Sequence, residues 1–253
     1  MSQNPTAHIR REAEEYAAHL PDLVLPAGHP DSRPMAAWID HTLLKSEATP
    51  SQIDQLCAEA LQYSFATVCI NPIYVGQAAL SLKDSSVGVC SVIGFPLGAT
   101  PTRVKVFETR TCLELGASEI DMVLPVGLLR AGEYDAVLED IQSVTAAAHA
   151  QGALLKVIFE NALLDDLAKI CACLLCKEAG VDFVKTSTGF GPGGATLSDV
   201  ELMRRIVGPQ MGVKAAGGVR SLADARAFLS AGATRLGTSS GAKIISELGS
   251  EGL

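Results

Sequence analysis

Three lysines lie inside apolar segments of the sequence, where lysine is seldom found. Lys156, Lys185 and Lys214 stand within the runs ALLKVIFE, VDFVKTS and MGVKAAG, which resemble three successive buried strands. Lysine is almost never buried without a charged partner or a chemical task. For Lys156 alone we favour a structural role, such as an ion pair. For Lys185 and Lys214 together, each followed within four residues by a glycine, we favour catalysis.

The chemistry that suits paired lysines is amine catalysis. An amine attacks a carbonyl only when it is unprotonated, whereas an ordinary lysine, with a pKa of about 10.4, is almost fully charged at neutral pH. A second ammonium group nearby and partial burial both disfavour the charged form. A carboxylate that moves protons completes a Schiff-base site. The candidates are Asp121, in the run EIDMVLP, and Asp40, in the run AAWID.

Glycine and serine gather in the loops that follow the last three apolar runs. The loop residues that we expect to contact a ligand are Gly189 in the first loop, Gly217, Gly218 and Arg220 in the second, and Gly237, Ser239 and Ser240 in the third. Glycines let the backbone approach an oxyanion, and barrels often bind a phosphate with the loops after strands seven and eight. The sequence therefore predicts a phosphorylated ligand.

Eight apolar runs of strand length alternate with helix-like segments and must position these residues. The runs are AAWID (36–40), FATVCI (65–70), VGVCSVIGF (87–95), EIDMVLP (119–125), ALLKVIFE (153–160), VDFVKTS (181–187), MGVKAAG (211–217) and TRLGTSS (234–240). This alternation predicts an α/β fold, a TIM (β/α)₈ barrel. An open doubly wound sheet is the competitor, but its glycine-rich dinucleotide fingerprint is missing after the first run. We expect a helical extension and linker at residues 1–35 and a catalytic barrel at residues 36–253.

Composition narrows the class of protein further. The chain has 253 residues, 48% of them hydrophobic, a net charge of −8 and a pI near 5.1. With no basic run, we expect no nucleic-acid partner. Seven scattered cysteines do not indicate a disulfide framework. The sequence shows neither an apolar leader segment nor a stretch that could span a membrane, so we expect a cytoplasmic protein without a membrane partner.

Eight short strings give the chain a resemblance to the deoxyribose-phosphate aldolase family. They occur in the family's order, as IDHTLLK (39–45), VCINP (68–72), IGFPLG (93–98), EIDMV (119–123), LLKVIFE (154–160), FVKTSTGF (183–190), VKAAGGVR (213–220) and RLGTSSG (235–241). The strings VKTSTG and KAAGGVR are specific when they occur together. The resemblance covers nearly all of the expected barrel.

This resemblance implies a class I aldolase that interconverts 2-deoxy-D-ribose 5-phosphate with D-glyceraldehyde 3-phosphate and acetaldehyde. It implies that Lys185 is the Schiff-base nucleophile, that Lys214 beside it favours its unprotonated form, and that Asp121 relays protons through a bound water. Lys156 would support this relay or contact a sugar hydroxyl. We expect Asp40, Cys69 and Thr186 to line the site with the loop residues. No metal or cofactor is expected, because the iminium accepts the electrons, and we expect a homodimer or homotetramer.

Some residues depart from the family pattern or have structural interpretations. Residue 161 is Asn where a threonine is familiar, and the last tyrosine is Tyr134, so we expect no tail tyrosine in proton transfer. His41 is expected in a hydrogen-bonded network beneath the site. The remaining expectations concern helical segments, where we interpret Cys171, Cys173 and Cys176 as core and surface residues rather than a metal cluster, and Arg103 and Lys105 as solvated.

Three alternatives stay open at this point. The chain could be another Schiff-base barrel aldolase or transaldolase that acts on a different sugar phosphate. It could instead be a sugar-phosphate isomerase barrel, which moves protons without a covalent adduct. A barrel that has lost catalysis and serves as a binding protein is the third alternative, against which the presence of Lys185, Lys214 and Asp121 argues.

Overall fold

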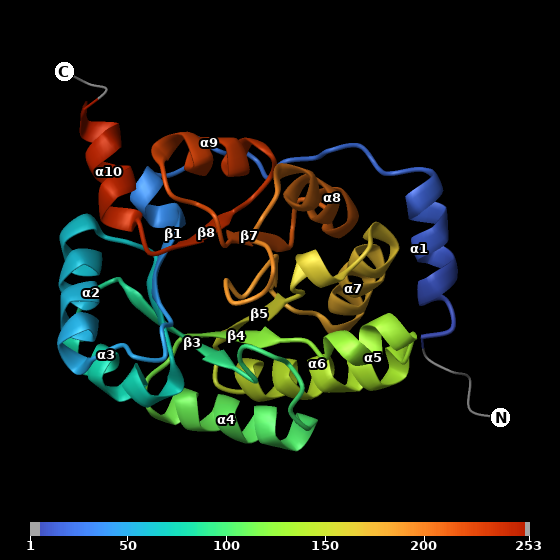
Figure 1. The fold of residues 1–253 in the computed structure, drawn as a ribbon, viewed down its shortest axis with the longest axis horizontal. Coiled ribbons are helices and arrows are strands. Elements are labelled where there is room, and N and C mark those ends of the chain that lie inside the picture. Colours follow the sequence, from blue (N-terminus) through green and yellow to red (C-terminus); the bar gives the residue numbers. More distant parts are fainter. Residues whose placement is uncertain (1–5, 251–253) are drawn as a thin grey trace.

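A computed structural model describes residues 6–250 and shows a closed barrel of eight parallel strands in chain order (Figure 1). Each strand pairs with the next along the chain, and the last pairs with the first. The strands are β1 (Ile39–Leu43), β2 (Thr67–Ile70), β3 (Gly88–Ile93), β4 (Glu119–Val123), β5 (Leu154–Ile158), β6 (Phe183–Lys185), β7 (Gly212–Ala216) and β8 (Arg235–Thr238). The predicted TIM barrel is confirmed.

Helices surround the barrel and connect its strands. The α-helices are α1 (Ile9–Ala18), α2 (Pro50–Tyr63), α3 (Val75–Ser81), α4 (Thr102–Glu114), α5 (Val126–Ala131), α6 (Tyr134–His149), α7 (Asp166–Ala179), α8 (Leu197–Val207), α9 (Leu222–Ser230) and α10 (Gly241–Ser250). Short 3₁₀ helices cover Met35–Trp38, Pro72–Tyr74 and Asn161–Leu163. The first apolar run is therefore split, because Ala36 and Ala37 belong to a 3₁₀ helix and β1 continues to Leu43.

Local sequence signals explain where several helices begin and end. Thr49 caps α2 through a capping box with Gln52, and Ser221 caps α9 in the same way with Asp224. Gly180 ends α7 in the left-handed conformation, which a residue without a Cβ adopts without steric cost. These signals fix the lengths of the connections and therefore the order in which the strands meet.

The register of the strands places the charged side chains opposite one another. Asp121 of β4 pairs with Lys156 of β5, and Lys185 of β6 pairs with Lys214 of β7. Because side chains alternate between the two faces of a strand, residues two apart share a face. Leu154 and Phe183, two positions before Lys156 and Lys185, line a cavity at the amino-terminal end of the barrel. The lysines lie one layer closer to the carboxyl end.

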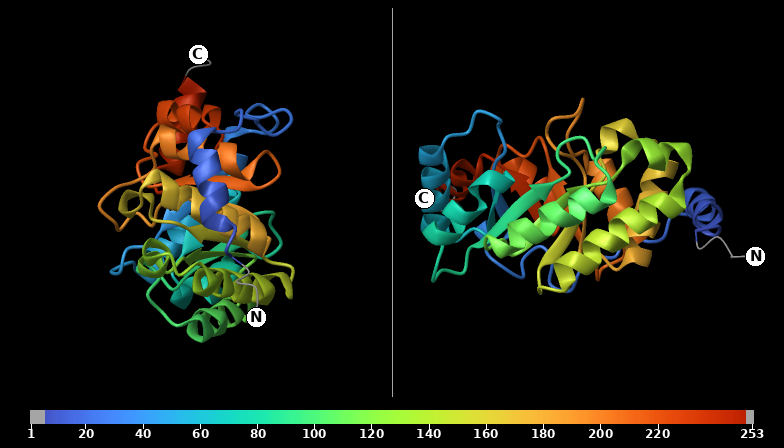
Figure 2. Two further views of the ribbon diagram at one scale, coloured as in Figure 1. Left: turned by 90° about the vertical axis from the view of Figure 1, so that its right-hand side faces the viewer. Right: turned by 90° about the horizontal axis from the view of Figure 1, so that it is seen from below.

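The N-terminal helix lies on the flank of the barrel. Helix α1 contacts α7, with Ile9 and Ala13 buried, and it lies on the opposite side of the molecule from α10 (Figures 1 and 2). The chain then returns along α8, where Arg205 donates a hydrogen bond to the carbonyl of Pro21 at 2.8 Å. Residues of the segment 26–38 reach the amino-terminal end of the barrel. The helix thus packs against the side of the barrel, and the linker rather than the helix covers part of its lower end.

One expectation about an outer helix is wrong. Lys105 of α4 is fully buried rather than solvated, and its ammonium group contacts Asp140 of α6 at 2.6 Å and the carbonyl of Val123 at 2.9 Å. The partner lies 35 residues away in the sequence, so the helical position of Lys105 alone did not reveal it. Cys171, Cys173 and Cys176 are all buried. None of the helices between residues 6 and 250 is both long and apolar enough to cross a bilayer.

Candidate active site

Asp121 connects the two lysines that the sequence singled out as a pair. The ammonium nitrogens of Lys185 and Lys214 lie 2.7 and 2.8 Å from Oδ2 of Asp121. Lys156 binds the other oxygen, Oδ1, at 2.9 Å. The carboxylate therefore holds three lysines, one from each of three consecutive strands.

Glycine at position 237 leaves room for this arrangement. A Cβ at this position would lie 3.1 Å from Cε of Lys214 and 3.1 Å from Cβ of Ala216. Gly237 pairs in register with Asp40 of β1 on one side and with Ala216 of β7 on the other. The missing side chain lets the stem of Lys214 cross β8 toward Asp40. The closure of the barrel and the identity of residue 237 together bring Lys214 to its carboxylates.

Two more carboxylates and an arginine extend the cluster toward the amino-terminal end of the barrel. Asp40 contacts Lys214 at 2.5 Å and Arg235 at 2.6 Å. Glu119 contacts Lys156 at 2.5 Å and Arg235 at 3.1 Å. We call these seven side chains the charged cluster, and its members are Asp40, Glu119, Asp121, Lys156, Lys185, Lys214 and Arg235. When all are ionised, it contains four cations and three carboxylates, so it carries one surplus positive charge.

The electrostatics of the cluster keep most of these groups charged. Burial disfavours ionisation of Asp121, but Lys156, Lys185 and Lys214 outweigh burial and hold its pKa well below the ordinary value. Burial likewise opposes the charged form of Lys156 and of Lys214. Carboxylates, with Asp121 the strongest, outweigh burial in both cases and raise the two pKa values above that of an ordinary lysine. These two ammonium groups therefore keep their protons at neutral pH.

Lys185 differs from its neighbours in exposure and in the number of its carboxylate partners. Its side chain is 3% exposed, whereas those of Lys156 and Lys214 are 0% exposed. Among residues 6–250, only Asp121 forms an ion pair with Lys185. Lys214 contacts two carboxylates and Lys156 contacts three. Lys185 therefore has the fewest carboxylate partners of the three lysines, and it is the only one of the three whose side chain is not fully buried.

A cavity of about 400 Å³ lies above Lys185 at the carboxyl ends of the strands. Its walls come from the segments that follow β1, β6, β7 and β8, and the lining residues are Thr42, Leu43, Leu44, Lys45, Lys185, Thr188, Gly189, Phe190, Ala216, Gly217, Gly218, Val219, Arg220, Gly237, Thr238 and Ser239. Gly217 and Gly218 have φ angles of +81° and +98°, which side chains disfavour. The cavity thus combines the amine of Lys185 with glycine-rich backbone and with cations at its rim.

Comparison with known proteins agrees with this geometry. The family described as DeoC/LacD family aldolase matches residues 35–247. This chain belongs to the DeoC/LacD family of aldolases. A deoxyribose-phosphate aldolase from Thermococcus gammatolerans is 58% identical over 83% of this chain and 95% of its own length. One from Halalkalibacterium halodurans is 55% identical, with 87% of this chain and 99% of the relative covered.

A solved structure shares the same architecture over the full length. The deoxyribose phosphate aldolase from Aeropyrum pernix, described as having a unique tetrameric structure, superposes with a TM-score of 0.81 at 35% identity. The match covers 98% of this chain and 100% of the other. The N-terminal segment is therefore included in the structural similarity, although the family match begins only at residue 35.

The structure does not bring all of the predicted residues of this aldolase to the cavity. Seven of the expected residues line it, and these are Lys185, Gly189, Gly217, Gly218, Arg220, Gly237 and Ser239. Lys156, Lys214, Asp121 and Asp40 lie below it, fully buried. Lys156 thus lies beneath Lys185 and is not among the residues that line the cavity.

Four other expected residues have structural contacts outside the cavity. Thr186 exchanges hydrogen bonds of 3.1 Å with the backbone of Ala216, and the backbone N–H of Ser240 donates to Thr238. Cys69 is buried with its sulfur 3.8 Å from Asp121. His41 faces away from the cluster and contacts Glu59 at 2.6 Å. Asp40 contacts Lys214 and Lys156, whereas His41 pairs with Glu59 instead.

Cys69, Cys90 and Asp121 are the one group in the described chain that has metal-ligand geometry. The ligand atoms of these three residues lie within 4.8 Å of one another. Both carboxylate oxygens of Asp121, however, already accept from ammonium groups. Burial raises the pKa of Cys90 well above its ordinary value, which keeps its thiol protonated. A cation at this position would meet three lysines, so the cluster disfavours a metal.

Sequence reasoning missed two members of the charged cluster and one cation of the cavity. Glu119 and Arg235 are the first residues of β4 and β8. In the sequence, a charged residue at this position looks like a polar residue that marks the start of a strand. Glu119 lies two residues before Asp121, and this spacing could have indicated that both face the barrel interior. Lys45, in the segment that follows β1, also lines the cavity. Its exposed loop position offered no comparable signal.

Proposed function

We propose that this aldolase cleaves 2-deoxy-D-ribose 5-phosphate to D-glyceraldehyde 3-phosphate and acetaldehyde through an iminium on Lys185. One observation carries the proposal. Lys185 is the single ammonium of the charged cluster that lines the upper cavity, and the other two lysines keep their protons beneath it. The names of relatives at 55–58% identity support the choice of substrate.

The charge balance of the cluster supports a free amine. Like-charge repulsion between Lys185 and Lys214 is only one part of this balance. Three carboxylates also contact the cations, so the balance of the whole cluster decides which group loses a proton. When Lys185 becomes neutral, three cations face three carboxylates. The neutral amine is thus the state in which the buried charges cancel.

The cleavage then proceeds in two stages, formation of an iminium on Lys185 and breakage of the C2–C3 bond. The nitrogen of Lys185 adds to the aldehyde carbon of the open-chain sugar, and loss of water gives an iminium. Removal of the proton from the 3-hydroxyl breaks the C2–C3 bond, and the electron pair moves into the iminium to give an enamine. Asp121, 2.7 Å from the lysine nitrogen, holds and returns protons at that atom. Protonation of the enamine and addition of water release acetaldehyde.

The loops above Lys185 provide a place for the phosphate. Gly217, Gly218 and Ser239 present backbone at the wall of the cavity, and Arg220 and Lys45 supply positive charge at its rim. The backbone N–H groups of loops after strands seven and eight are a common phosphate site in barrels. The phosphate would anchor the substrate so that its aldehyde reaches Lys185.

Product analysis with several sugar phosphates tests this function. The wild-type protein should release acetaldehyde and glyceraldehyde 3-phosphate from 2-deoxyribose 5-phosphate, and it should release no acetaldehyde from ribose 5-phosphate. Lys185→Arg should abolish the release. An isomerase would retain activity in this variant and form a ketose. A different aldolase would cleave another sugar phosphate faster.

We also propose a homo-oligomeric state and a cytoplasmic location. The relative from Aeropyrum pernix is described as tetrameric, which supports self-association. All seven cysteines are free and buried, as suits a reducing compartment. Light scattering at several concentrations, together with fractionation of the source cells, tests both statements.

A further inference from the structure

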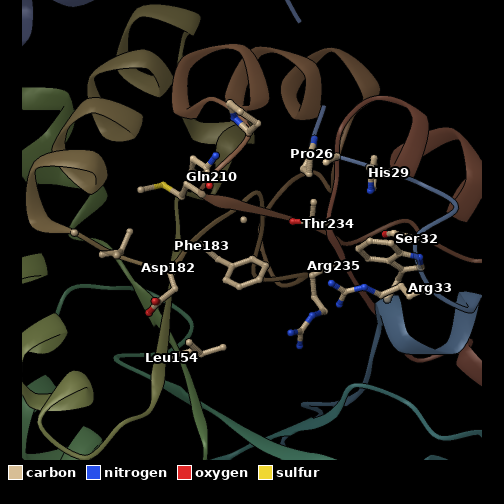
Figure 3. A pocket seen from close by; sticks show the side chains of 17 residues that line it. Pro26, His29, Ser32, Arg33, Leu154, Asp182, Phe183, Gln210, Thr234 and Arg235 are labelled. Atoms are coloured by element: carbon tan, nitrogen blue, oxygen red, sulfur yellow. The ribbon is translucent and has the colours of Figure 1, made fainter. Parts of the chain in front are cut away.

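A second cavity lies at the amino-terminal end of the barrel, on the far side of the charged cluster from Lys185. Its volume is about 580 Å³. Strands β5 to β8 contribute residues from their beginnings, and residues of the segment 26–38 close one wall (Figure 3). It shares none of its lining residues with the upper cavity. The proposed reaction therefore leaves it without a role.

Two guanidinium groups, those of Arg33 and Arg235, line this cavity. Arg33 lies over the ring of Trp38, with its central carbon 4.3 Å from the ring centroid, and forms no ion pair within the described residues 6–250. Arg235 is 93% buried, and its terminal nitrogens contact Asp40 and Glu119. Its Nε–H group, however, is buried without a hydrogen-bond partner. In Figure 3 both side chains extend into the same side of the cavity.

The other titratable groups of the lining do not neutralise Arg33. Asp182 lies on the opposite side of the cavity in Figure 3, and its carboxylate accepts from the backbone of Leu155 at 2.8 Å and contacts His149 at 2.9 Å. Burial lowers the pKa of His29, so this ring is neutral at pH 7. Its Nε2 bonds to the carbonyl of Leu229 at 2.8 Å. Asp40 and Glu119 balance the charge of Arg235, so the cavity offers one unpaired cation, Arg33, and one unsatisfied N–H donor, Nε of Arg235. This combination favours a negatively charged occupant.

The rest of the wall is suited to an apolar body. Phe183 stands in the middle of the view, with Leu154 and Gln210 around it (Figure 3). Met211 and Val181 also line the cavity. A planar guanidinium binds carboxylate and phosphate groups with paired hydrogen bonds. An aromatic ring and apolar side chains beside such a group are the usual composition of a small-molecule site.

We propose that the lower cavity binds a small organic anion. Its carboxylate or phosphate group would lie between Arg33 and Arg235, and its apolar part would pack against Phe183 and Met211. The ligand is distinct from the substrate, because the two cavities open at opposite ends of the barrel.

Hydrogen exchange with two probes, phenyl phosphate and benzoate, tests the proposal and separates phosphate from carboxylate. At least one probe should slow exchange in the segments 26–38 and 209–213 of the wild-type protein. Arg33→Gln should raise the probe concentration needed for half of this slowing by at least about tenfold, because charged hydrogen bonds are lost. Arg130→Gln, which removes an exposed arginine of α5, should leave the effect unchanged.

Two results would overturn the proposal. Slowed exchange confined to the loops 217–220 and 239–241 would show that the probes bind only in the upper cavity. An equal effect in wild type and Arg33→Gln would show that the guanidinium group does not hold the anion. Arg33 is exposed, so its replacement by glutamine should not prevent folding, and unchanged exchange in the core strands without probe serves as the check.

Discussion

Lys185 and Lys214 donate to the same oxygen of Asp121, at 2.7 and 2.8 Å. This shared acceptor holds two ammonium groups from neighbouring strands close together, and its negative charge offsets the repulsion between them. It also distinguishes them, because Lys214 has Asp40 as a second partner, whereas Lys185 faces the cavity. The distribution of carboxylates therefore leaves Lys185 as the amine with fewer ion-pair partners and with access to the cavity.

Removal of the positive charge of Lys214 should shift the pH dependence of the reaction. In Lys214→Met the cluster keeps three cations and three carboxylates, so Lys185 is needed in its charged form for balance. We expect kcat/KM at pH 7 to fall by about 100-fold and its acid limb to move by about 1–2 pH units to higher pH. A rate profile measured from pH 5 to 10 checks this. Lys83→Met, at an exposed position, serves as the charge control, and coincident profiles would remove Lys214 from its role.

Asp121 should link the stability of the fold to acid. Its pKa in the folded protein is well below the ordinary value of about 3.9, so below that value the unfolded chain binds a proton that the folded chain does not. The stabilisation is present above the unfolded pKa and is lost as the pH falls through the folded pKa. Asp121→Asn should lower the free energy of unfolding at pH 7 by about 3–5 kcal/mol and weaken its decline below pH 4. Urea unfolding at pH 7 and pH 3.5 measures both effects. An equally steep decline in the variant would contradict the assignment.

A negative charge at position 239 should discriminate against phosphorylated substrate. Ser239 is exposed and lines the upper cavity. Ser239→Glu should reduce kcat/KM for 2-deoxyribose 5-phosphate by about 100-fold, because like charges placed together cost several kcal/mol. Activity on unphosphorylated 2-deoxyribose should stay near that of the wild type. Ser86→Glu places the same charge before β3 and should alter neither rate. Equal losses with both substrates would mean that the phosphate binds elsewhere.

Lys105 tests whether a buried lysine outside the cluster is purely structural. Lys105→Met should leave the buried carboxylate of Asp140 without its cation and lower the free energy of unfolding by about 3–5 kcal/mol. The kcat and KM of the folded enzyme should not change. The double variant with Asp140→Leu should recover part of the lost stability, because no unpaired charge remains. Chemical denaturation and steady-state kinetics at one temperature provide the data. A kinetic change without loss of stability would be inconsistent with a structural role.

The sequence was sufficient for the fold because its apolar runs record burial on both faces of each strand. It was also sufficient for the positions of Lys156, Lys185 and Lys214, whose charge interrupts these runs. It was insufficient for Arg235 and Glu119, because a charged residue at the first position of a strand has the same pattern whether it points inward or marks a boundary. Lys105 was misplaced for a related reason, since its partner Asp140 lies on a different helix.

The exposure of each lysine could not be predicted from the sequence either. Of the three lysines, only Lys185 lines the upper cavity, and Lys156 and Lys214 lie beneath it. The strand runs alone do not show this difference in depth. This layering follows from the stagger of the strands in a closed barrel. Gly237 contributes as well, because the space it leaves beside Lys214 is visible only in three dimensions.

We propose that Lys185, the one ammonium of the charged cluster that lines the upper cavity, forms the imine. Reduction with borohydride in the presence of acetaldehyde, followed by peptide mapping with mass spectrometry, tests it most directly. We expect an ethyl group on Lys185 and none on Lys156 or Lys214. An ethyl group on Lys214 or Lys156 in the native protein, or labelling confined to surface lysines, would contradict it.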